Sequence, residues 1–218
     1  MEDLTIIFLT LNKVPKLWSQ YHKKVLLEAV QESPIITISR QRLDWGWKNL
    51  IQSEEPSVNN IYKQILRASK IATTDYIAIA EDDNLYHKSH FEYRPPKETF
   101  GFNGHRWGVF TWGKPFYYHK NRISNATMIA PRELVVKSLT ERFKLYPNNQ
   151  IGELGKEKGT RLNRYNIKMF YSDVGVIYFS HKNGLDGTER RRTKKPSPIQ
   201  AYDIKYWGKI EKLRKEWK

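Results

Sequence analysis

The sequence predicts an α/β protein in which helices cover both faces of a mostly parallel sheet. Strand-like and helix-like segments alternate along residues 4–80, the strand-like segments are almost wholly apolar, and an acidic cluster follows the third of them. Such alternation favours βαβ units, and strands that are covered on both faces are apolar throughout. A chain of 218 residues is long enough to bury one sizeable core.

Each of the first elements rests on a local pattern. The three strand-like runs are rich in β-branched and aromatic residues, which favour strands. Pro34 ends the first helical stretch, and Ser57 is a residue type that caps the start of the second. The expected order is strand 4–10, helix 12–31, strand 35–39, a polar loop at 40–56, helix 57–68 and strand 75–80.

The rest of the chain is less regular. Residues 85–118 carry many aromatic side chains without a clear period, and we expect irregular structure there. Pro131 suits the start of a helix, whereas three glycines weaken the helix expected after it. The further elements are strand 122–130, helix 131–143, helix 148–164, strands 167–171 and 175–180, an arginine-rich loop at 182–193 and a basic amphipathic helix at 201–218.

Composition excludes several classes of protein. The chain has no cysteine, which rules out disulfides, thiolate catalysis and cysteine-based zinc sites. Its apolar runs are too short to span a bilayer and it opens without a leader pattern, so we expect an intracellular, cytoplasmic protein without stable membrane insertion. Its oligomeric state stays open.

The charge is distributed unevenly. Residues 1–100 carry 13 basic and 13 acidic side chains, whereas residues 101–218 carry 25 and 10, so the whole net charge of +15 lies in the second part. A polyanionic partner for that part is expected, with a solubilising surface charge as the alternative.

An acidic cluster, Glu81-Asp82-Asp83, directly follows the strand expected at 75–80. In parallel sheets ligands bind beyond the carboxyl ends of the strands. Neighbouring carboxylates raise one another's pKa, and a divalent cation with a preference for oxygen ligands, Mg²⁺ or Mn²⁺, removes that penalty. A solvated turn is the alternative interpretation.

Residues 75–91 (DYIAIAEDDNLYHKSHF) resemble the DxD region of GT-A-fold glycosyltransferases, which use nucleotide-diphosphate sugars, and Thr10-Leu11-Asn12 resembles the start of family-2-like members. The resemblance covers roughly residues 4–90, and residues 120–182 by pattern only. It implies a Rossmann-like GT-A sheet and a UDP-sugar donor. It also implies that Asp83 ligates Mn²⁺ or Mg²⁺ while Glu81 and Asp82 lie near the ribose and the donor sugar.

The same family pattern implies two more residues. It expects a late histidine after a strand as a further metal ligand, and His181 fits. It expects an acid near the start of a helix as general base, and Glu153 fits, with Glu157 as its competitor; an inverting reaction follows if Glu153 is the base. A structural histidine and ordinary helix-end charge are the alternatives.

One departure leaves the donor base open. Many members carry an acid after the second strand, where this chain has Ser39-Arg40-Gln41, and the nearest acid is Asp44. Asn60 and Lys63 face either the donor or solvent. The expected nucleotide-sugar residues are Thr10, Leu11, Asn12, Ser39, Asn60, Lys63, Glu81 and Asp82.

The basic second part points to the acceptor. Arg190, Arg191, Arg192, Lys194 and Lys195 form a compact cationic run suited to phosphates. A GT-A enzyme with such a part resembles the phage and kinetoplastid glycosyltransferases that modify hydroxymethylated pyrimidines in DNA. DNA is therefore the expected acceptor, with a phage-infected bacterial cell as one setting.

Two alternatives stand beside that acceptor. The first is synthesis of a cell-surface polysaccharide or glycolipid, with the helix expected at 201–218 lying on a membrane. The second is a non-catalytic nucleic-acid-binding module. The expected division is a glycosyltransferase domain at 1–182, with donor half 1–100 and acceptor half 101–182, and a basic helical extension at 183–218.

Overall fold

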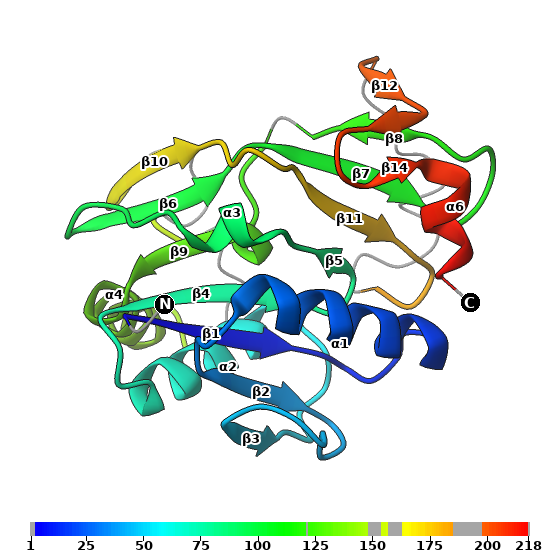
Figure 1. Ribbon diagram of the computed structural model, residues 1–218. Helices are drawn as coiled ribbons and strands as arrows, with labels where there is room; N and C mark the ends of the chain where they lie inside the picture. Colours follow the sequence, from blue (N-terminus) through cyan, green and yellow to red (C-terminus); the bar gives the residue numbers. More distant parts are fainter. Residues whose placement is uncertain (1–2, 121, 148–153, 157–162, 185–197, 218) are drawn as a thin grey trace.

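The computed structural model describes residues 3–120, 122–147, 154–156, 163–184 and 198–217. A seven-stranded sheet forms its centre (Figure 1). Its strands are β1 (Leu4–Leu9), β2 (Ile35–Ser39), β3 (Lys48–Ile51), β4 (Tyr76–Glu81), β6 (Thr99–Asn103), β9 (Met128–Pro131) and β10 (Asn166–Phe170), in the order β10-β6-β9-β4-β1-β2-β3. β9 runs antiparallel to both of its neighbours, and the other four pairs are parallel. The predicted α/β class with a mostly parallel sheet is confirmed.

Helices cover both faces of this sheet. α1 (Lys16–Val30) packs on one face through residues such as Leu26, together with Ile6 and Phe8 of β1. α2 (Val58–Ile71) and α4 (Arg132–Leu145) pack on the other face, together with Ile7 and Ile79. Because successive residues of a strand point to opposite faces, a strand covered on both faces is apolar at nearly every position, as predicted for β1, in which Thr5 is the one polar residue.

The two helix starts show how local residues set the boundaries. The Ser57 side chain accepts a hydrogen bond from the Asn60 backbone N–H, so Ser57 is the predicted N-cap of α2. α1 begins at Lys16, four residues later than expected, because Asn12 adopts a left-handed backbone conformation with φ of 56° and Pro15 is extended. A residue in the left-handed region interrupts a right-handed helix.

The expectation of irregular structure at 85–118 is wrong, because this segment supplies most of a second sheet. The second sheet has the order β12-β8-β7-β11-β5. Its strands are β5 (Asn84–Leu85), β7 (Arg106–Phe110), β8 (Tyr117–His119), β11 (Val176–Ser180) and β12 (Gln200–Ala201), and a short helix, α3 (Lys88–Phe91), follows β5. Most of these strands are very short, and β7 is interrupted by Gly108, so their sequences lack the alternation by which strands are recognised.

Three further expectations need correction. The loop expected at 40–56 contains the edge strand β3, and the strand expected at 122–130 is a 3-10 turn, η1 (Asn125–Thr127), followed by β9. Most of the helix expected at 148–164 lies outside the described residues. The described part at 154–156 and 163–164 is a turn with an antiparallel bridge between Lys156 and Asn163, not a helix.

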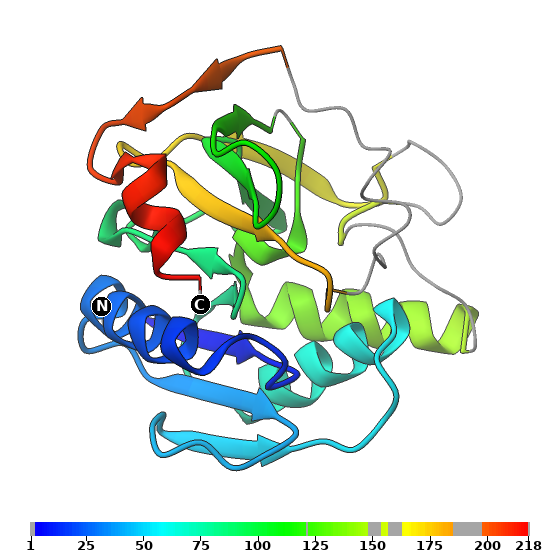
Figure 2. The ribbon, with the colours of Figure 1, turned by 90° about the vertical axis from the view of Figure 1, so that its right-hand side faces the viewer.

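The C-terminal segment is not one long helix. It forms a hairpin of β13 (Asp203–Ile204) and β14 (Gly208–Lys209), followed by α6 (Ile210–Lys215). Tyr206 and Gly208 both have positive φ, 75° and 70°, which a continuous helix excludes. Ile210 and Leu213 pack in a third core cluster with Trp18 of α1. Figure 2 shows the C-terminal helix α6 in red on the side of the molecule where the blue α1 lies. The apolar side of α6 is therefore buried in the protein, which corrects the picture of a helix lying on a membrane.

No helix within the described residues has the length and apolar character needed to cross a membrane.

Candidate active site

A cavity of about 450 Å³ lies at the carboxyl ends of β1, β2 and β4. The register of β1 with β4 pairs Leu9 with Glu81, so the residues that follow, Thr10 and Asp82, emerge side by side at this edge. The Thr10 hydroxyl donates a hydrogen bond to an Asp82 carboxylate oxygen. The cavity therefore lies at the carboxyl end of the parallel strands, where sequence analysis placed the acidic cluster.

Asp82 is held on two sides. Its backbone carbonyl accepts a hydrogen bond from the Trp18 indole N–H at 2.7 Å, and its carboxyl group accepts from Thr10. Burial and, next, the negative charge of Asp83 raise the pKa of Asp82 to about 7, although the hydrogen bond from Thr10 acts in the opposite direction. A nearby cation would favour the ionised form of this carboxyl group.

Asp83 and His181 come from different sheets and meet in the cavity wall. The Asp83 carboxylate and the His181 imidazole lie 3.6 Å apart, measured from Oδ2 to Nε2, and the two residues are only 8% and 6% exposed. A backbone hydrogen bond of 2.8 Å from the Phe179 N–H to the Asp83 carbonyl ties the end of β11 to the turn after β4. Residues almost a hundred positions apart are thereby brought together, as the family resemblance implied.

This pair fits a divalent cation that takes other ligands from its substrate. The described residues contain no group of three His, Cys, Asp or Glu side chains able to hold a metal ion. Mg²⁺ and similar cations commonly use one or two protein carboxylates and complete their coordination with water and phosphate oxygens. One carboxylate oxygen of Asp83 accepts a hydrogen bond from the Asn84 amide at 2.6 Å, and the other, Oδ2, is the one that faces His181.

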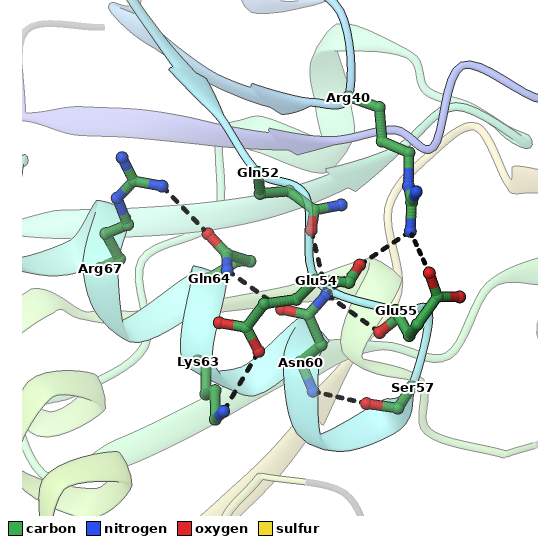
Figure 3. Close-up of polar contacts among 9 residues, drawn as sticks. All are labelled: Arg40, Gln52, Glu54, Glu55, Ser57, Asn60, Lys63, Gln64 and Arg67. Carbon is green, nitrogen blue, oxygen red and sulfur yellow. Dashed lines mark hydrogen bonds and ion pairs between the residues drawn. The ribbon is translucent and has the colours of Figure 1, made fainter.

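A network of buried amides lines another part of the cavity (Figure 3). Asn60 lies at its centre: its amide nitrogen donates to Gln52 at 3.1 Å, and its oxygen accepts from Gln64 at 3.0 Å. The three side chains are between 5% and 7% exposed. Sequence analysis found Asn60 but missed Gln52 and Gln64, although Gln64 lies four positions after Asn60 and therefore on the same face of α2.

Three of the expected nucleotide-sugar residues have other partners. Asn12 accepts hydrogen bonds from the backbone N–H groups of Arg40 and Gln41, Ser39 is wholly buried, and Lys63 pairs with Glu54 at the surface. None of the three is among the described residues that line the cavity. The expected site residues that do line it are Thr10, Leu11, Asn60, Glu81, Asp82, Asp83 and His181.

The expected general base, Glu153, its competitor Glu157, and the cationic run of Arg190, Arg191, Arg192, Lys194 and Lys195 lie outside the described residues. Their roles stay predictions.

The cavity is also lined, on the side of the second sheet, by basic side chains that sequence analysis did not assign to the donor site. Arg106 of β7 is only 2% exposed, and Lys120 and Arg122 follow β8. The Lys120 ammonium lies 3.8 Å from the centre of the Tyr178 ring. We call Arg106, Lys120 and Arg122 the cationic wall. The one sequence signal for it is an arginine within a strand that is otherwise apolar and aromatic.

A second cavity, of about 420 Å³, adjoins the first and shares His181 and Asn183 with it. Two tryptophans, Trp112 and Trp217, line it. The Trp217 ring lies against His181, with ring centres 4.9 Å apart. Two cavities therefore meet at the histidine that sequence analysis assigned to the metal.

The fold and site define an α/β protein with a ligand cavity at the carboxyl edge of its parallel strands. No family model matches the sequence, and no curated protein matches it significantly.

Solved structures that resemble the chain include a glycosyltransferase involved in the glycosylation of the major capsid of PBCV-1. Its identity is 10% and its TM-score 0.42, over 80% of this chain and 92% of that one. HddC from Yersinia pseudotuberculosis has 11% identity and a TM-score of 0.48 over the same shares. The bifunctional IspDF from Campylobacter jejuni has 7% identity and a TM-score of 0.42 over 79% of this chain, which spans half the length of that protein. Likeness at this level carries no conclusion about chemistry, which has to come from the residues of the site.

Proposed function

We propose that the protein is a metal-assisted glycosyltransferase of the GT-A kind, which transfers a sugar from a nucleoside-diphosphate sugar, a UDP-sugar in the first instance, to a hydroxyl group. The observation that carries the proposal is the meeting of Asp83 and His181, 3.6 Å apart, in a cavity that Asp82 and Asn60 also line. Acids at a strand end, a histidine from a second sheet and buried amides fit the diphosphate and the nucleoside of one ligand.

Asp83 and His181 are the residues that would hold Mn²⁺ or Mg²⁺. When bound, the cation neutralises charge that develops on the departing diphosphate. Asp82 is fixed by Thr10 and by Trp18, so that its orientation toward the donor is set before the ligand arrives. Such preorganisation is a large part of what an active site contributes to catalysis.

The amide network is suited to the nucleoside. Each amide side chain offers both hydrogen-bond donors and an acceptor, as the edges of nucleobases require. Gln52 and Gln64 are buried and each is hydrogen-bonded to Asn60, which fixes the direction in which their remaining amide groups point. Glu153 stays the proposed general base, taking the proton from the acceptor hydroxyl as it attacks the anomeric carbon.

The test is the binding of UDP with and without Mn²⁺, measured by calorimetry and thermal shift, for wild type, Asp83→Asn and His181→Gln. Both variants should weaken binding of UDP with Mn²⁺ by roughly tenfold or more, the scale on which loss of metal-site groups acts. Binding of UDP in EDTA should change little. Asp44→Asn is the matched control, because Asp44 is an exposed acid that pairs with Lys23 at 3.0 Å.

Equal Mn²⁺ dependence in wild type and both variants would remove Asp83 and His181 from the metal site. If UDP does not bind and no UDP-sugar is turned over in the presence of metal, the protein is not the proposed enzyme. That result would favour the non-catalytic module.

We propose DNA that carries hydroxymethylated pyrimidines as the acceptor, because the net charge of +15 lies wholly in residues 101–218. Lysine and arginine side chains bind the phosphates of the DNA backbone, so a large positive charge favours binding to DNA. A polysaccharide or glycolipid acceptor is the competing outcome of the acceptor experiment described in the Discussion.

A further inference from the structure

Arg106 is a buried cation in the cavity wall. It is 2% exposed, and one of its guanidinium nitrogens donates to the Arg122 carbonyl at 2.9 Å. Among the described residues, its Nε has no hydrogen-bond partner and no carboxylate forms an ion pair with it. Burial lowers the pKa of Arg106, and the negative charge of Glu81 is among the smaller effects that oppose it. Because burying a guanidinium costs several kcal/mol, this position suits a further negatively charged partner.

The neighbouring residue Arg122 makes the position a site rather than an isolated charge. Arg122 is exposed, lines the same cavity, and accepts the Arg106 hydrogen bond through its backbone carbonyl. Both arginines therefore belong to the lining of one cavity, from which a ligand group is open to each. Guanidinium groups bind carboxylates and phosphates through paired, charge-assisted hydrogen bonds.

The charge of the described cavity lining exceeds what a donor diphosphate needs. Four basic residues line it against three acids, a balance of +1; they are Lys13, Arg106, Lys120 and Arg122 against Glu81, Asp82 and Asp83. A divalent cation on Asp83 and His181 would raise that balance to +3, because a bound ion belongs to the local charge count. The two negative charges of a nucleotide-sugar diphosphate would bring the described lining back to +1, a count that does not include Glu153, the proposed general base.

We propose that the cavity binds a second anionic group besides the donor diphosphate, a carboxylate or a phosphate, and that Arg106 and Arg122 hold it. This inference rests on the proposed function for its first anion. The second anion has two sources: an acidic sugar on the donor, such as a uronic acid, or an acidic group on the acceptor. In either case the substrate is an acidic one, and the cationic wall is what selects it.

The experiment measures dissociation constants by calorimetry in the presence of Mn²⁺. The donor arm compares UDP, UDP-glucose and UDP-glucuronate. The acceptor arm compares glucose, glucuronate and glucose 6-phosphate on protein saturated with UDP and Mn²⁺. An acidic ligand in one arm should bind about tenfold or more tightly than its neutral counterpart, the scale of one charge-assisted hydrogen bond, and the arm that shows it identifies the source.

Arg122→Gln should remove most of that preference while leaving the affinity for UDP itself unchanged. Arg122 is exposed, so this variant keeps the fold. Arg106→Lys keeps the positive charge but loses the paired N–H donors of the guanidinium group. It should reduce the preference as well, provided that its thermal unfolding matches wild type. Arg132→Gln is the control, because it removes one positive charge outside the cavity lining.

Three outcomes overturn the inference. These are no preference for acid in either arm, a preference that survives Arg122→Gln, and an equal loss of UDP affinity in Arg122→Gln, which would place the cationic wall on the diphosphate. The proposed function fails differently. If UDP does not bind but glucuronate or glucose 6-phosphate binds in a manner that depends on Arg122, the anion site stands and the nucleotide-sugar site does not.

Discussion

Buried histidines close to the cavity show how single residues respond to their surroundings. His90 is wholly buried, and its Nδ1 lies 3.1 Å from the Asn103 amide nitrogen. Burial and, next, the positive charge of Arg106 lower the pKa of His90 to about 3. Burial likewise lowers the pKa of His22, which lies beneath the turn after β4, to about 4. The folded protein therefore keeps both rings neutral at pH values where the unfolded chain protonates them.

The sign of the resulting pH dependence follows from these directions. A histidine with a lowered pKa contributes stability that is complete above its unfolded pKa of about 6.5 and is lost as the pH falls toward the folded pKa. We expect the free energy of unfolding to fall between pH 6.5 and about pH 4, by up to about 1.4 kcal/mol per pH unit for each histidine. In His90→Phe the free energy of unfolding should change less steeply with pH, because one of the two titrating histidines is gone. Urea unfolding at several pH values between about 4 and 6.5 measures this slope.

The control for that measurement is Phe91→Leu. This change in the same cluster has no titrating group, so it should lower stability by a similar amount at every pH. A slope in His90→Phe that equals the wild-type slope would show that His90 does not titrate across folding.

Among the elements, the strands of the second sheet are built around one close approach. Gly108 of β7 pairs with Tyr118 of β8, and a Cβ atom at Gly108 would lie 2.3 Å from the Tyr118 ring. The ring crosses the glycine and stacks on Phe110, with ring centres 4.7 Å apart. Arg106 and Lys120 lie two residues from this crossing, so the crossing positions the cationic wall.

Gly108→Ala should destabilise the protein by about 1–3 kcal/mol, as overpacking of a core does. Tyr118 is only 5% exposed and stacked on Phe110, so the ring has little room to move aside. Chemical unfolding of Gly108→Ala, Tyr118→Ala and the double variant measures the coupling between the two positions. If alanine at position 108 costs as much without the Tyr118 ring as with it, the ring contact is not the cause.

This crossing also shows where prediction from the sequence ends. β1, β2, β4 and α2 were predicted nearly to the residue, because each is long, apolar or capped, and the parallel sheet followed from their order. β7 and β8 were missed, because their pairing depends on a glycine and a tyrosine ten residues apart rather than on any pattern within a strand. The same holds for the site: Asp83 follows its own strand in the sequence, whereas the partners of Arg106 become visible only once β7 and β8 are paired.

At the scale of the whole molecule, the division of charge along the sequence is not a division in space. β6, β9 and β10 from the basic part complete the sheet that β1, β2 and β4 begin. The cationic wall stands in the same cavity as Glu81, Asp82 and Asp83. An acidic and a basic region of one ligand site are thereby assembled from the two parts of the chain.

The acceptor prediction belongs to this scale. With Mn²⁺ and a labelled UDP-sugar, DNA that contains 5-hydroxymethylcytosine or 5-hydroxymethyluracil should take up label, and unmodified DNA of the same sequence should not. Binding to the DNA should weaken steeply as salt rises, by a factor that depends on the number of phosphates contacted. Label on polysaccharide or lipid and none on DNA would favour the alternative acceptor, and DNA binding without transfer would favour the non-catalytic module.

The contact between Trp18 and Trp217, with ring centres 4.6 Å apart, has a consequence for the order in which the protein forms. Proteins are made from the N-terminus, and early segments begin to fold during synthesis. α1 and its sheet can assemble while Trp18 still lacks the partner that lies at the other end of the sequence. Contacts between such distant positions form slowly, because they close a very long loop. The Trp217 ring, which lines the second cavity, can therefore reach Trp18 only after every strand of the seven-stranded sheet has been synthesised.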